Sequence, residues 1–426
     1  MAEVQLKREL GLFHTTLAGV GIILGAGIYV LIGAAAGLTG NTIWLAFVIG
    51  AVVSLFTGFS YAELSSMFPK DSAEYSYTEK SFGKGIAFFI GYLVLLSAII
   101  SASAVAIGFA GYFGSLFKID QVLLISMMLI LFLSYINFRS IKVSSWMNIL
   151  CTLIEMAGLV IIIALGIFKG FTSHDAINYL EMPNGFSGVL QTAALVFFAY
   201  IGFESVVKLS EETKNPTKII PKALILSVII STVLYIAVAV AAITVLDWEA
   251  LAASKAPLAD VAAVLLGNNA FILLSVIALF STANTVLISL IAGSRALYGI
   301  SREYKKINIF TRVHPKNRTP HIAIWLVMIV SLLFCLIKEI DLIAELTNFT
   351  IFITFALINL SLIFLRYKSP DLERPYKAPL NVGRFPVMAL FGILSCVFLT
   401  TQLSLTVIIG GFILSLLGFI FYFLLK

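Results

Sequence analysis

The chain has 426 residues, of which 60% are hydrophobic and only 12% are charged. A soluble domain is nearer half apolar and a quarter charged, so this composition excludes a soluble protein and predicts one that crosses the lipid bilayer many times. The net charge of +6 would suit nucleic acid. The positive residues instead follow the membrane topology described below, so no nucleic-acid partner is expected.

Twelve apolar runs along the chain are long enough to cross a bilayer as helices, since each crossing needs about 20 residues. The division between the last two falls within residues 400–404. No loop is long enough to fold as a separate domain. We therefore predict an all-α integral membrane protein with twelve transmembrane helices in one domain, residues 1–426. The predicted spans are 14–38, 42–67, 86–115, 121–138, 145–168, 188–208, 222–246, 270–298, 321–338, 347–366, 385–402 and 404–425.

Lysine and arginine are distributed unequally between the two sides of this topology. Twelve spans place both termini on one side, and 24 of the 28 Lys and Arg residues fall on that side or at span ends facing it. Positive residues stay in the cytoplasm during membrane insertion, so the chain is predicted to lie in the cell membrane with both termini cytoplasmic. The exceptions are Lys118, Lys169, Lys255 and Lys338.

Glycine interrupts the first and sixth predicted spans, in "GVGIILGAGIYVLIG" (19–33) and "FFAYIGFESVV" (197–207). Glycine in a helix interior costs about 1 kcal/mol relative to alanine. A pair of glycine-interrupted spans at corresponding positions is typical of an inverted-repeat transporter, whose unwound backbone binds the substrate. The alternative is close packing of helices through small residues. The transporter interpretation predicts repeats at about 14–168 and 188–366, with spans 11 and 12 (about 385–425) outside them.

Five ordered motifs along the chain resemble the amino acid–polyamine–organocation (APC) superfamily of permeases, whose spans form the LeuT fold of 5+5 inverted repeats plus two C-terminal helices. The resemblance implies an amino-acid transporter that works by alternating access. The motifs are the glycine-rich first span, "YAELSSMFPKDSAEYSYTEKSFG" (61–83), "FFAYIGFESVVKLSEETKNPTKIIPKAL" (197–224), "AGSRALYGISRE" (292–303) and "SPDLERPYKAPL" (369–380).

The resemblance also implies a substrate site built from backbone groups at the two breaks, Gly25 and Gly202. The substrate carboxylate would meet the N–H groups of Ala26, Gly27 and Ile28. Its amino group would meet the carbonyl groups of Ile22, Ile23, Phe198, Ala199 and Ile201. The side-chain pocket is predicted to be apolar, because its residues include no acid, and this favours a small or hydrophobic neutral amino acid. Those pocket residues are Ile23, Phe198, Ile201 and Ile288.

Carboxyl groups inside predicted spans are functional candidates, since a charge at the bilayer centre costs at least a few kcal/mol. Glu204 follows the second break by two residues, and the two hypotheses are proton coupling and a hydrogen bond that holds the break together. Glu155 lies near the position where many APC members carry a lysine, so that mechanism does not transfer. Glu155 would bind a proton or a cation such as sodium, or pair with a hydroxyl such as Ser281 or Thr282.

Two further charged residues, Glu63 and Arg295, lie near the cytoplasmic ends of spans 2 and 8. They are candidates for a cytoplasmic gate, in which Arg295 pairs with Glu63 or Glu211; the alternatives are a structural ion pair for Glu63 and contact of Arg295 with lipid phosphate. The histidines and cysteines have no metal-ligand spacing, so no metal site is expected.

The functional prediction is a secondary active transporter, with proton-coupled uptake preferred. The alternative is an amino-acid exchanger, with cationic amino acids or polyamines as substrates. No nucleotide-binding motif or cofactor motif occurs, so ATP-driven transport is not expected. A channel lacks its polar stripe, and an enzyme lacks clustered catalytic groups. A sensor lacks a large soluble tail.

Overall fold

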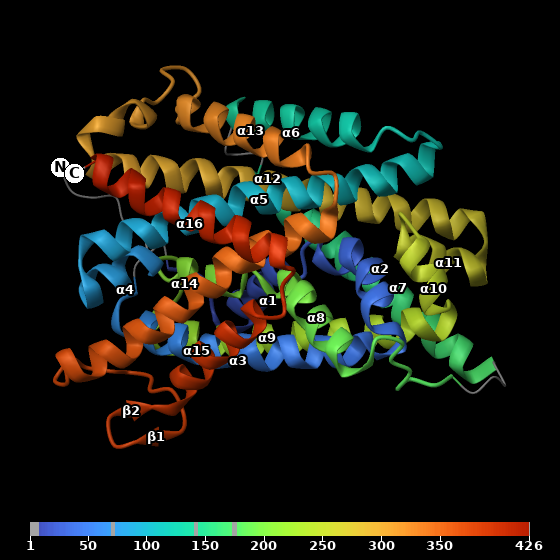
Figure 1. The fold of residues 1–426 in the computed structure, drawn as a ribbon, viewed down its shortest axis with the longest axis horizontal. Coiled ribbons are helices and arrows are strands. Elements are labelled where there is room, and N and C mark those ends of the chain that lie inside the picture. The colour runs from blue at the N-terminus through green and yellow to red at the C-terminus, as the bar shows by residue number, and fades with distance from the viewer. Residues whose placement is uncertain (1–7, 70–72, 140–143, 173–176, 426) are drawn as a thin grey trace.

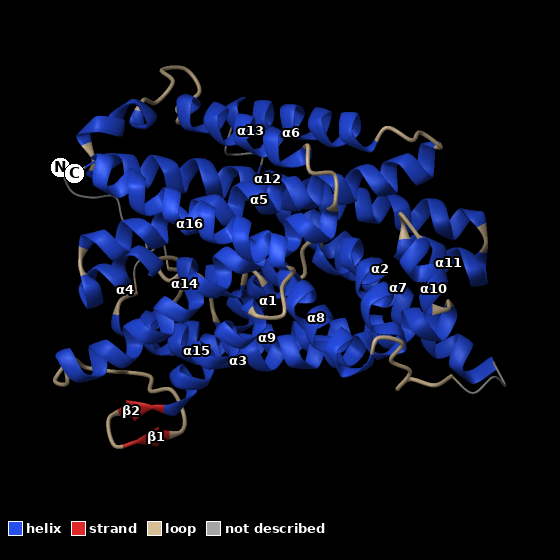
Figure 2. Ribbon diagram, viewed as in Figure 1, coloured by secondary structure: helices blue, strands red, loops and turns tan. Residues whose placement is uncertain are grey.

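The computed structural model of the chain describes residues 8–69, 73–139, 144–172 and 177–425. These residues are almost entirely helical, as Figure 2 shows. The strands among them form one two-stranded antiparallel hairpin, β1 (Asn381–Val382) and β2 (Phe385–Pro386). The prediction of an all-α fold is confirmed.

The first five predicted spans each contain helix, and the first is interrupted. The short helices η1 (Gly40–Thr42) and α4 (Ala73–Phe82) lie in the connections. The span helices are α1 (Leu12–Ile23) followed by α2 (Gly27–Thr39), α3 (Ile43–Met67), α5 (Lys84–Phe117), α6 (Val122–Arg139) and α7 (Ser144–Thr172).

The sixth predicted span is also interrupted, and two further apolar helices follow the tenth. The connections contain α10 (Trp248–Ala253), α11 (Pro257–Leu266) and η4 (Lys305–Thr311). The span helices are α8 (Gly185–Val196) with η2 (Phe197–Tyr200) and η3 (Phe203–Leu209), α9 (Pro216–Val245), α12 (Asn268–Glu303), α13 (His321–Cys335), α14 (Ile340–Lys368), α15 (Val387–Thr400) and α16 (Leu405–Leu425).

In the described part of the chain, nine helical stretches are long and apolar enough to cross a membrane. Two predicted spans are shorter than expected, because α13 has 15 residues and α15 has 14. At 1.5 Å per residue each reaches only about 22 Å, which is less than the roughly 30 Å hydrocarbon core. The chain is a multi-pass membrane protein, and these two helices are too short to cross the hydrocarbon core alone.

The helices pack in pairs that are five predicted spans apart. The two most extensive contacts are between α5 and α12 and between α3 and α9, which are spans 3 and 8 and spans 2 and 7. The helices α6 and α13 (spans 4 and 9) and α2 and α8 (spans 1 and 6) also pack together. Contact between equivalent helices is what two interlocked repeats would produce. The division into repeats itself stays a prediction.

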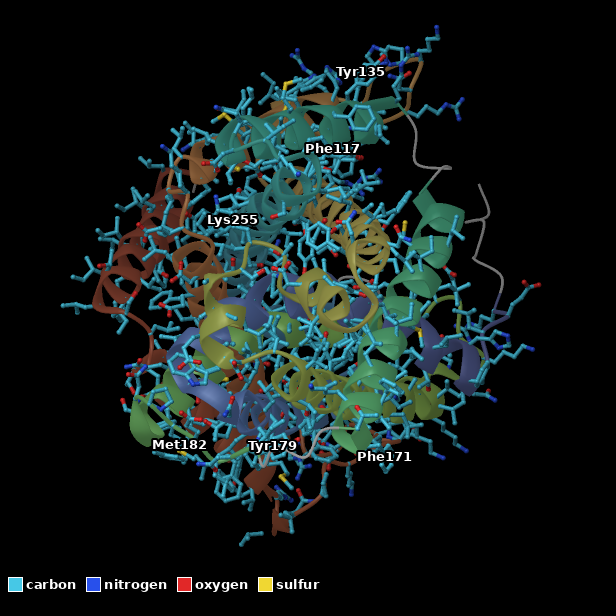
Figure 3. The ribbon with its side chains drawn as sticks, turned by 90° about the vertical axis from the view of Figure 1, so that its right-hand side faces the viewer. Phe117, Tyr135, Phe171, Tyr179, Met182 and Lys255 are labelled. Atoms are coloured by element: carbon cyan, nitrogen blue, oxygen red, sulfur yellow. The ribbon has the colours of Figure 1, made fainter. Side chains whose placement is uncertain are left out.

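The two ends of the molecule are built differently. In Figure 1, α4, the β1–β2 hairpin and the end of α16 lie towards the left, whereas α10 and α11 lie at the right. Figure 3 views the right-hand end, where Lys255 is near the centre and Tyr179 and Met182 lie below it. There Lys255 forms an ion pair of 2.9 Å with Asp120. Short helices therefore cover this end of the bundle.

A candidate binding site between two helix breaks

The first break separates α1 from α2 at residues 24–26. It contains Gly25, the position at which the sequence predicted it. In a continuous helix the N–H of Ala26 would bond to the carbonyl oxygen of Ile22. It donates instead to Oγ1 of Thr285 on α12, at 3.1 Å. The break therefore frees the Ile22 carbonyl from its helical partner. The N–H groups of the first turn of α2 also have no partner within that helix.

The second break lies at Ile201 and Gly202, between η2 and η3. Gly202 has a φ of +123°, a conformation that other residues rarely adopt. Its N–H donates to Oε2 of Glu204 at 2.9 Å. The hydrogen bond that the structural alternative for Glu204 requires is therefore present, and the coupling role of Glu204 stays a prediction. The helix after this break is a 3₁₀-helix, which the sequence did not predict.

The two breaks touch each other through their glycines. A Cβ atom on Gly27 would lie 2.6 Å from Cα of Ala199, and one on Gly202 would lie 2.9 Å from the carbonyl oxygen of Ile22. Both distances are shorter than van der Waals contact, so neither position accepts a side chain without movement of the backbone. Close packing through glycine is therefore confirmed, and it is compatible with binding at the same place.

The hydroxyl group of Tyr235 on α9 contacts backbone carbonyl groups next to both breaks. Its hydroxyl lies 2.7 Å from the carbonyl oxygen of Ile23 and 2.8 Å from that of Ala199, and its single proton can be donated to either. Both Tyr235 and Thr285 escaped the sequence analysis. Their only signal was a polar side chain in the middle of an apolar span, which does not show which helix it faces.

A cavity of about 400 Å³ lies against the two breaks. Ten of the eleven predicted substrate-binding residues line it, but Ile28 does not and is fully buried. The lining extends to Lys208 and to Glu74 on α4, the helix that lies at the left in Figure 1. The ten are Ile22, Ile23, Gly25, Ala26, Gly27, Phe198, Ala199, Ile201, Gly202 and Ile288.

The prediction that no acid faces this pocket was wrong, because Glu74, Glu155 and Glu204 are part of the lining. Each has a polar neighbour. Oε1 of Glu155 accepts a hydrogen bond of 2.6 Å from the Ser281 hydroxyl, which is one of the two partners predicted for it. Glu74 lies 4.0 Å from Nζ of Lys208. The cavity thus combines apolar walls with three partnered carboxyl groups.

Glu63 is fully buried and forms ion pairs with Arg366 and Arg374, not with Arg295. Nε of Arg366 donates to Oε1 of Glu63 at 2.9 Å, and the N–H of Ala378 donates to Oε2 at 2.8 Å. The predicted pairing of Glu63 with Arg295 was therefore wrong. The error arose because the true partners are about 300 residues away in the sequence, Arg366 in the last turn of α14 and Arg374 in the segment after it.

Arg295 has no ion pair within the part of the chain that the structure describes. Its Nε and Nη2 atoms are buried without a hydrogen-bond partner. The alternative partner, Glu211, is exposed and forms no ion pair with it among those residues. Among the described residues, no three His, Cys, Asp or Glu side chains come together as metal ligands; His174 lies outside them.

Comparison with known proteins gives one family and several kinds of named substrate. The profile described as "Amino acid permease" matches residues 10–424. The branched-chain amino acid permease BcaP of Bacillus subtilis is 32% identical over 99% of this chain and 94% of its own length. The methylthioribose transporter of the same organism is 32% identical over 88% of this chain and 84% of its own. Mouse cationic amino acid transporter 4 is 29% identical over 88% of this chain and 63% of its own length.

The contact between the breaks predicts that Gly27→Ala weakens ligand binding strongly, by about 5- to 150-fold. Its added methyl group overlaps the backbone of Ala199, and overpacking of this kind costs about 1–3 kcal/mol. The matched control is Gly37→Ala in the same helix, whose Cβ would lie 3.4 Å from Cβ of Ala252. Ligand-induced shifts of the melting temperature check both. Unchanged binding by Gly27→Ala would contradict the described contact.

The buried ion pair predicts that Glu63→Gln lowers the melting temperature strongly. The change leaves Arg366 buried without a counter-charge, a loss of about 3–5 kcal/mol. Glu303→Gln is the control, because its 4.0 Å contact with Lys84 is exposed and is worth at most about 1 kcal/mol. Limited proteolysis should also cut residues 369–386 faster in Glu63→Gln. Equal stability of the two variants would show that Glu63 does not hold this segment.

Proposed function

The chain belongs to the amino acid permease family, and from this premise we propose proton-coupled uptake of a small or hydrophobic neutral amino acid by alternating access. The family and its relatives are transporters, and amino acids are the substrate class. The single observation that carries the finer proposal is the cavity that lies against both helix breaks.

The charged ends of an amino acid match the backbone groups around this cavity. The first turn of α2 presents N–H groups and the positive end of its helix dipole, which suit a carboxylate. The N–H of Gly27 is a candidate donor to the substrate carboxylate. The N–H of Ala26 is a second candidate, and it would give up its hydrogen bond to the Thr285 hydroxyl when the substrate binds. The carbonyl oxygen of Ile22, freed from its helical bond, suits an ammonium group. This assignment leaves out Ile28, which lies outside the cavity.

The side-chain part of the cavity favours a neutral, apolar substrate. Its apolar surface comes from six residues, which are Ile23, Phe198, Ile201, Ile288, Ile351 and Phe355. The carboxylate of Glu204 is occupied by a backbone N–H, and Glu74 faces Lys208. Glu155 is the observation that favours the alternative, exchange of a cationic amino acid or polyamine, because its partner is only a hydroxyl.

We assign the coupling role to Glu204 first and Glu155 second. Protonation of Glu204 would weaken its hydrogen bond with Gly202 and so loosen the second break when a proton binds. Glu155 lines the same cavity and would take a proton, or bind sodium. Arg295 is half-buried, with two buried nitrogens that have no hydrogen-bond partner among the described residues, which suits a gate residue whose partner arrives only when the cavity closes. In this view Glu63 has a structural role and anchors the segment after α14.

The predicted orientation gives the cavity a direction. Its lining extends towards the end where the lysines and arginines concentrate, which the positive-inside rule assigns to the cytoplasm. The conformation is then inward-facing, in the cell membrane, with both termini cytoplasmic. The opposite end, covered by α10 and α11, would face outwards.

The pocket chemistry predicts that leucine, isoleucine or valine raises the melting temperature of the purified chain. A ligand at 100 times its dissociation constant adds about 2.7 kcal/mol of stability. Lysine, arginine, putrescine and methylthioribose are the comparison ligands. If a cation stabilises the chain and the branched amino acids do not, the exchanger alternative replaces this proposal.

Proton coupling predicts that Glu204→Gln loses uptake driven by a pH gradient in proteoliposomes, by about tenfold or more, while exchange of internal for external substrate persists. General acid–base groups typically contribute factors of about 10² or more to proton transfer. Glu155→Gln is the second test, and Glu249→Gln, on an outer loop, is the control. If both test variants keep the parent pH dependence, neither acid carries the proton.

A further inference from the structure

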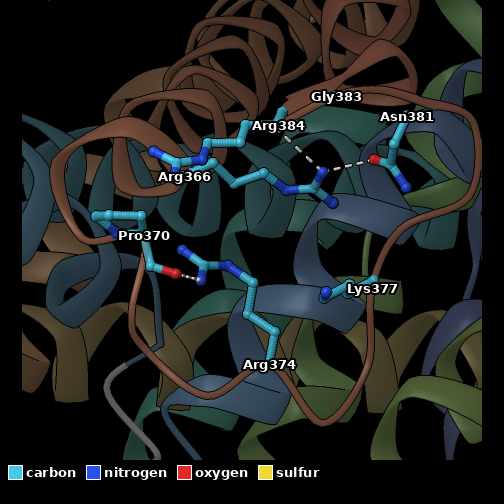
Figure 4. A pocket seen from close by; sticks show the side chains of 7 residues that line it. All are labelled: Arg366, Pro370, Arg374, Lys377, Asn381, Gly383 and Arg384. Carbon is cyan, nitrogen blue, oxygen red and sulfur yellow. Dashed lines mark hydrogen bonds between the residues drawn. The ribbon is translucent and has the colours of Figure 1, made fainter.

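A hollow of about 330 Å³ lies between the end of α14 and the β1–β2 hairpin, away from the central cavity. Figure 4 shows four cationic side chains around it, with Arg366 and Arg384 above and Arg374 and Lys377 below. In the part of the chain that the structure describes, the only acid that pairs with any of them is Glu63. A second carboxylate, that of Asp371, also acts on Arg374 without forming an ion pair with it. Four positive charges against these two negative charges leave the hollow with a net charge of about +2.

Two of the four cations are held in place, and two are free. Arg366 is anchored by Glu63 and by Oδ1 of Asn381. Arg374 donates to four carbonyl oxygens around the end of α14, including that of Leu372 at 2.8 Å. Lys377 and Arg384 are exposed and form no hydrogen bond or ion pair through their side chains with other described residues. The hollow therefore combines a rigid floor with two cations available to a ligand.

The positive charge of the hollow is costly without a counter-charge. Like charges about 4 Å apart repel by roughly 1 kcal/mol even in water, and by more at a partly buried site. Desolvation lowers the pKa of the Arg374 guanidinium, and neighbouring Arg366 also lowers it, although Glu63 and Asp371 oppose this effect. An anion that binds between the free cations would remove this repulsion.

The position of the hollow indicates where such an anion comes from. It lies between the last turn of α14, which ends at Lys368, and Val387, the first residue of α15, so it lies where the chain leaves and re-enters the membrane. Two large apolar residues beside it are strongly exposed, Leu380 at 60% and Val382 at 73%. Cations next to exposed apolar side chains suit the boundary between phospholipid headgroups and acyl chains.

We propose that this hollow binds a phosphate group, and that its source is the headgroup of an anionic phospholipid. Lys377 and Arg384 would contact the phosphate oxygens, while Leu380 and Val382 would lie among the adjoining acyl chains. Bound lipid would then hold the segment that Glu63 ties to α3. The site is separate from the substrate cavity and does not depend on the identity of the transported molecule.

The test measures the melting temperature of the purified full chain in an uncharged detergent, titrated with phosphatidylglycerol, phosphatidylcholine or inorganic phosphate. The parent should be stabilised by phosphatidylglycerol more than by phosphatidylcholine. At about a fivefold effect per cation near a membrane surface, Lys377→Gln/Arg384→Gln should require about 30-fold more phosphatidylglycerol for the same shift. Neither side chain is bonded in the fold, and the change removes part of the repulsion between the cations, so the lipid-free melting temperature should not fall.

The control is Lys218→Gln/Lys222→Gln, which removes the same charge from exposed positions at the start of α9. It should titrate like the parent. An equal loss in both double variants, or equal effects of the two lipids, would overturn the proposal, because general attraction of charge would then be sufficient. If inorganic phosphate stabilises the parent as well as phosphatidylglycerol does, and only Lys377→Gln/Arg384→Gln loses this, the phosphate site stands and its assignment to lipid is overturned.

Discussion

The structure depends on one constraint, which is that a peptide group inside a membrane must have a partner. Each unpaired N–H or C=O in hydrocarbon costs several kcal/mol. Two helices of this chain are nevertheless broken in the middle. The exposed groups are taken up by three side chains from other positions: Thr285 receives the N–H of Ala26, Tyr235 reaches the carbonyls of Ile23 and Ala199, and Glu204 receives the N–H of Gly202. The groups left over face the cavity.

The locations of the breaks were predictable from sequence because the cause is local. Glycine at 25, 27 and 202 is unfavourable in a helix and unnecessary unless the backbone bends or another backbone comes close. The partners of the breaks were not predictable. Tyr235 lies more than 200 residues from Ile23, and a hydroxyl within an apolar span carries no information about the helix it meets. The same limit explains Glu63, whose pairing with Arg374 joins the motif at 61–83 to the motif at 369–380.

The charges separate into two groups with different physical roles. Those of the central cavity are partnered by hydroxyl or backbone groups, or, for Glu74, by a lysine 4.0 Å away, so little prevents them from changing protonation or partner during a transport cycle. Those around Glu63 form close, buried ion pairs that are expensive to break. A transporter needs both kinds, because its substrate site must change shape while the rest of the bundle keeps its packing. Arg295 belongs to neither group, because it does not line the cavity and two of its nitrogens are buried without a hydrogen-bond partner in the part of the chain that the structure describes.

The central claim is that backbone groups at the two breaks bind both charged ends of one amino acid. The most direct measurement compares the affinity of the chain for leucine with that for its amine analogue, which lacks the carboxylate, and for its carboxylic-acid analogue, which lacks the amine. Hydrogen bonds to charged groups are worth about 1.5–3 kcal/mol each. Each analogue should therefore bind at least about tenfold more weakly than leucine. If leucine binds and either analogue binds as tightly as it does, the breaks do not recognise both ends, and the account fails.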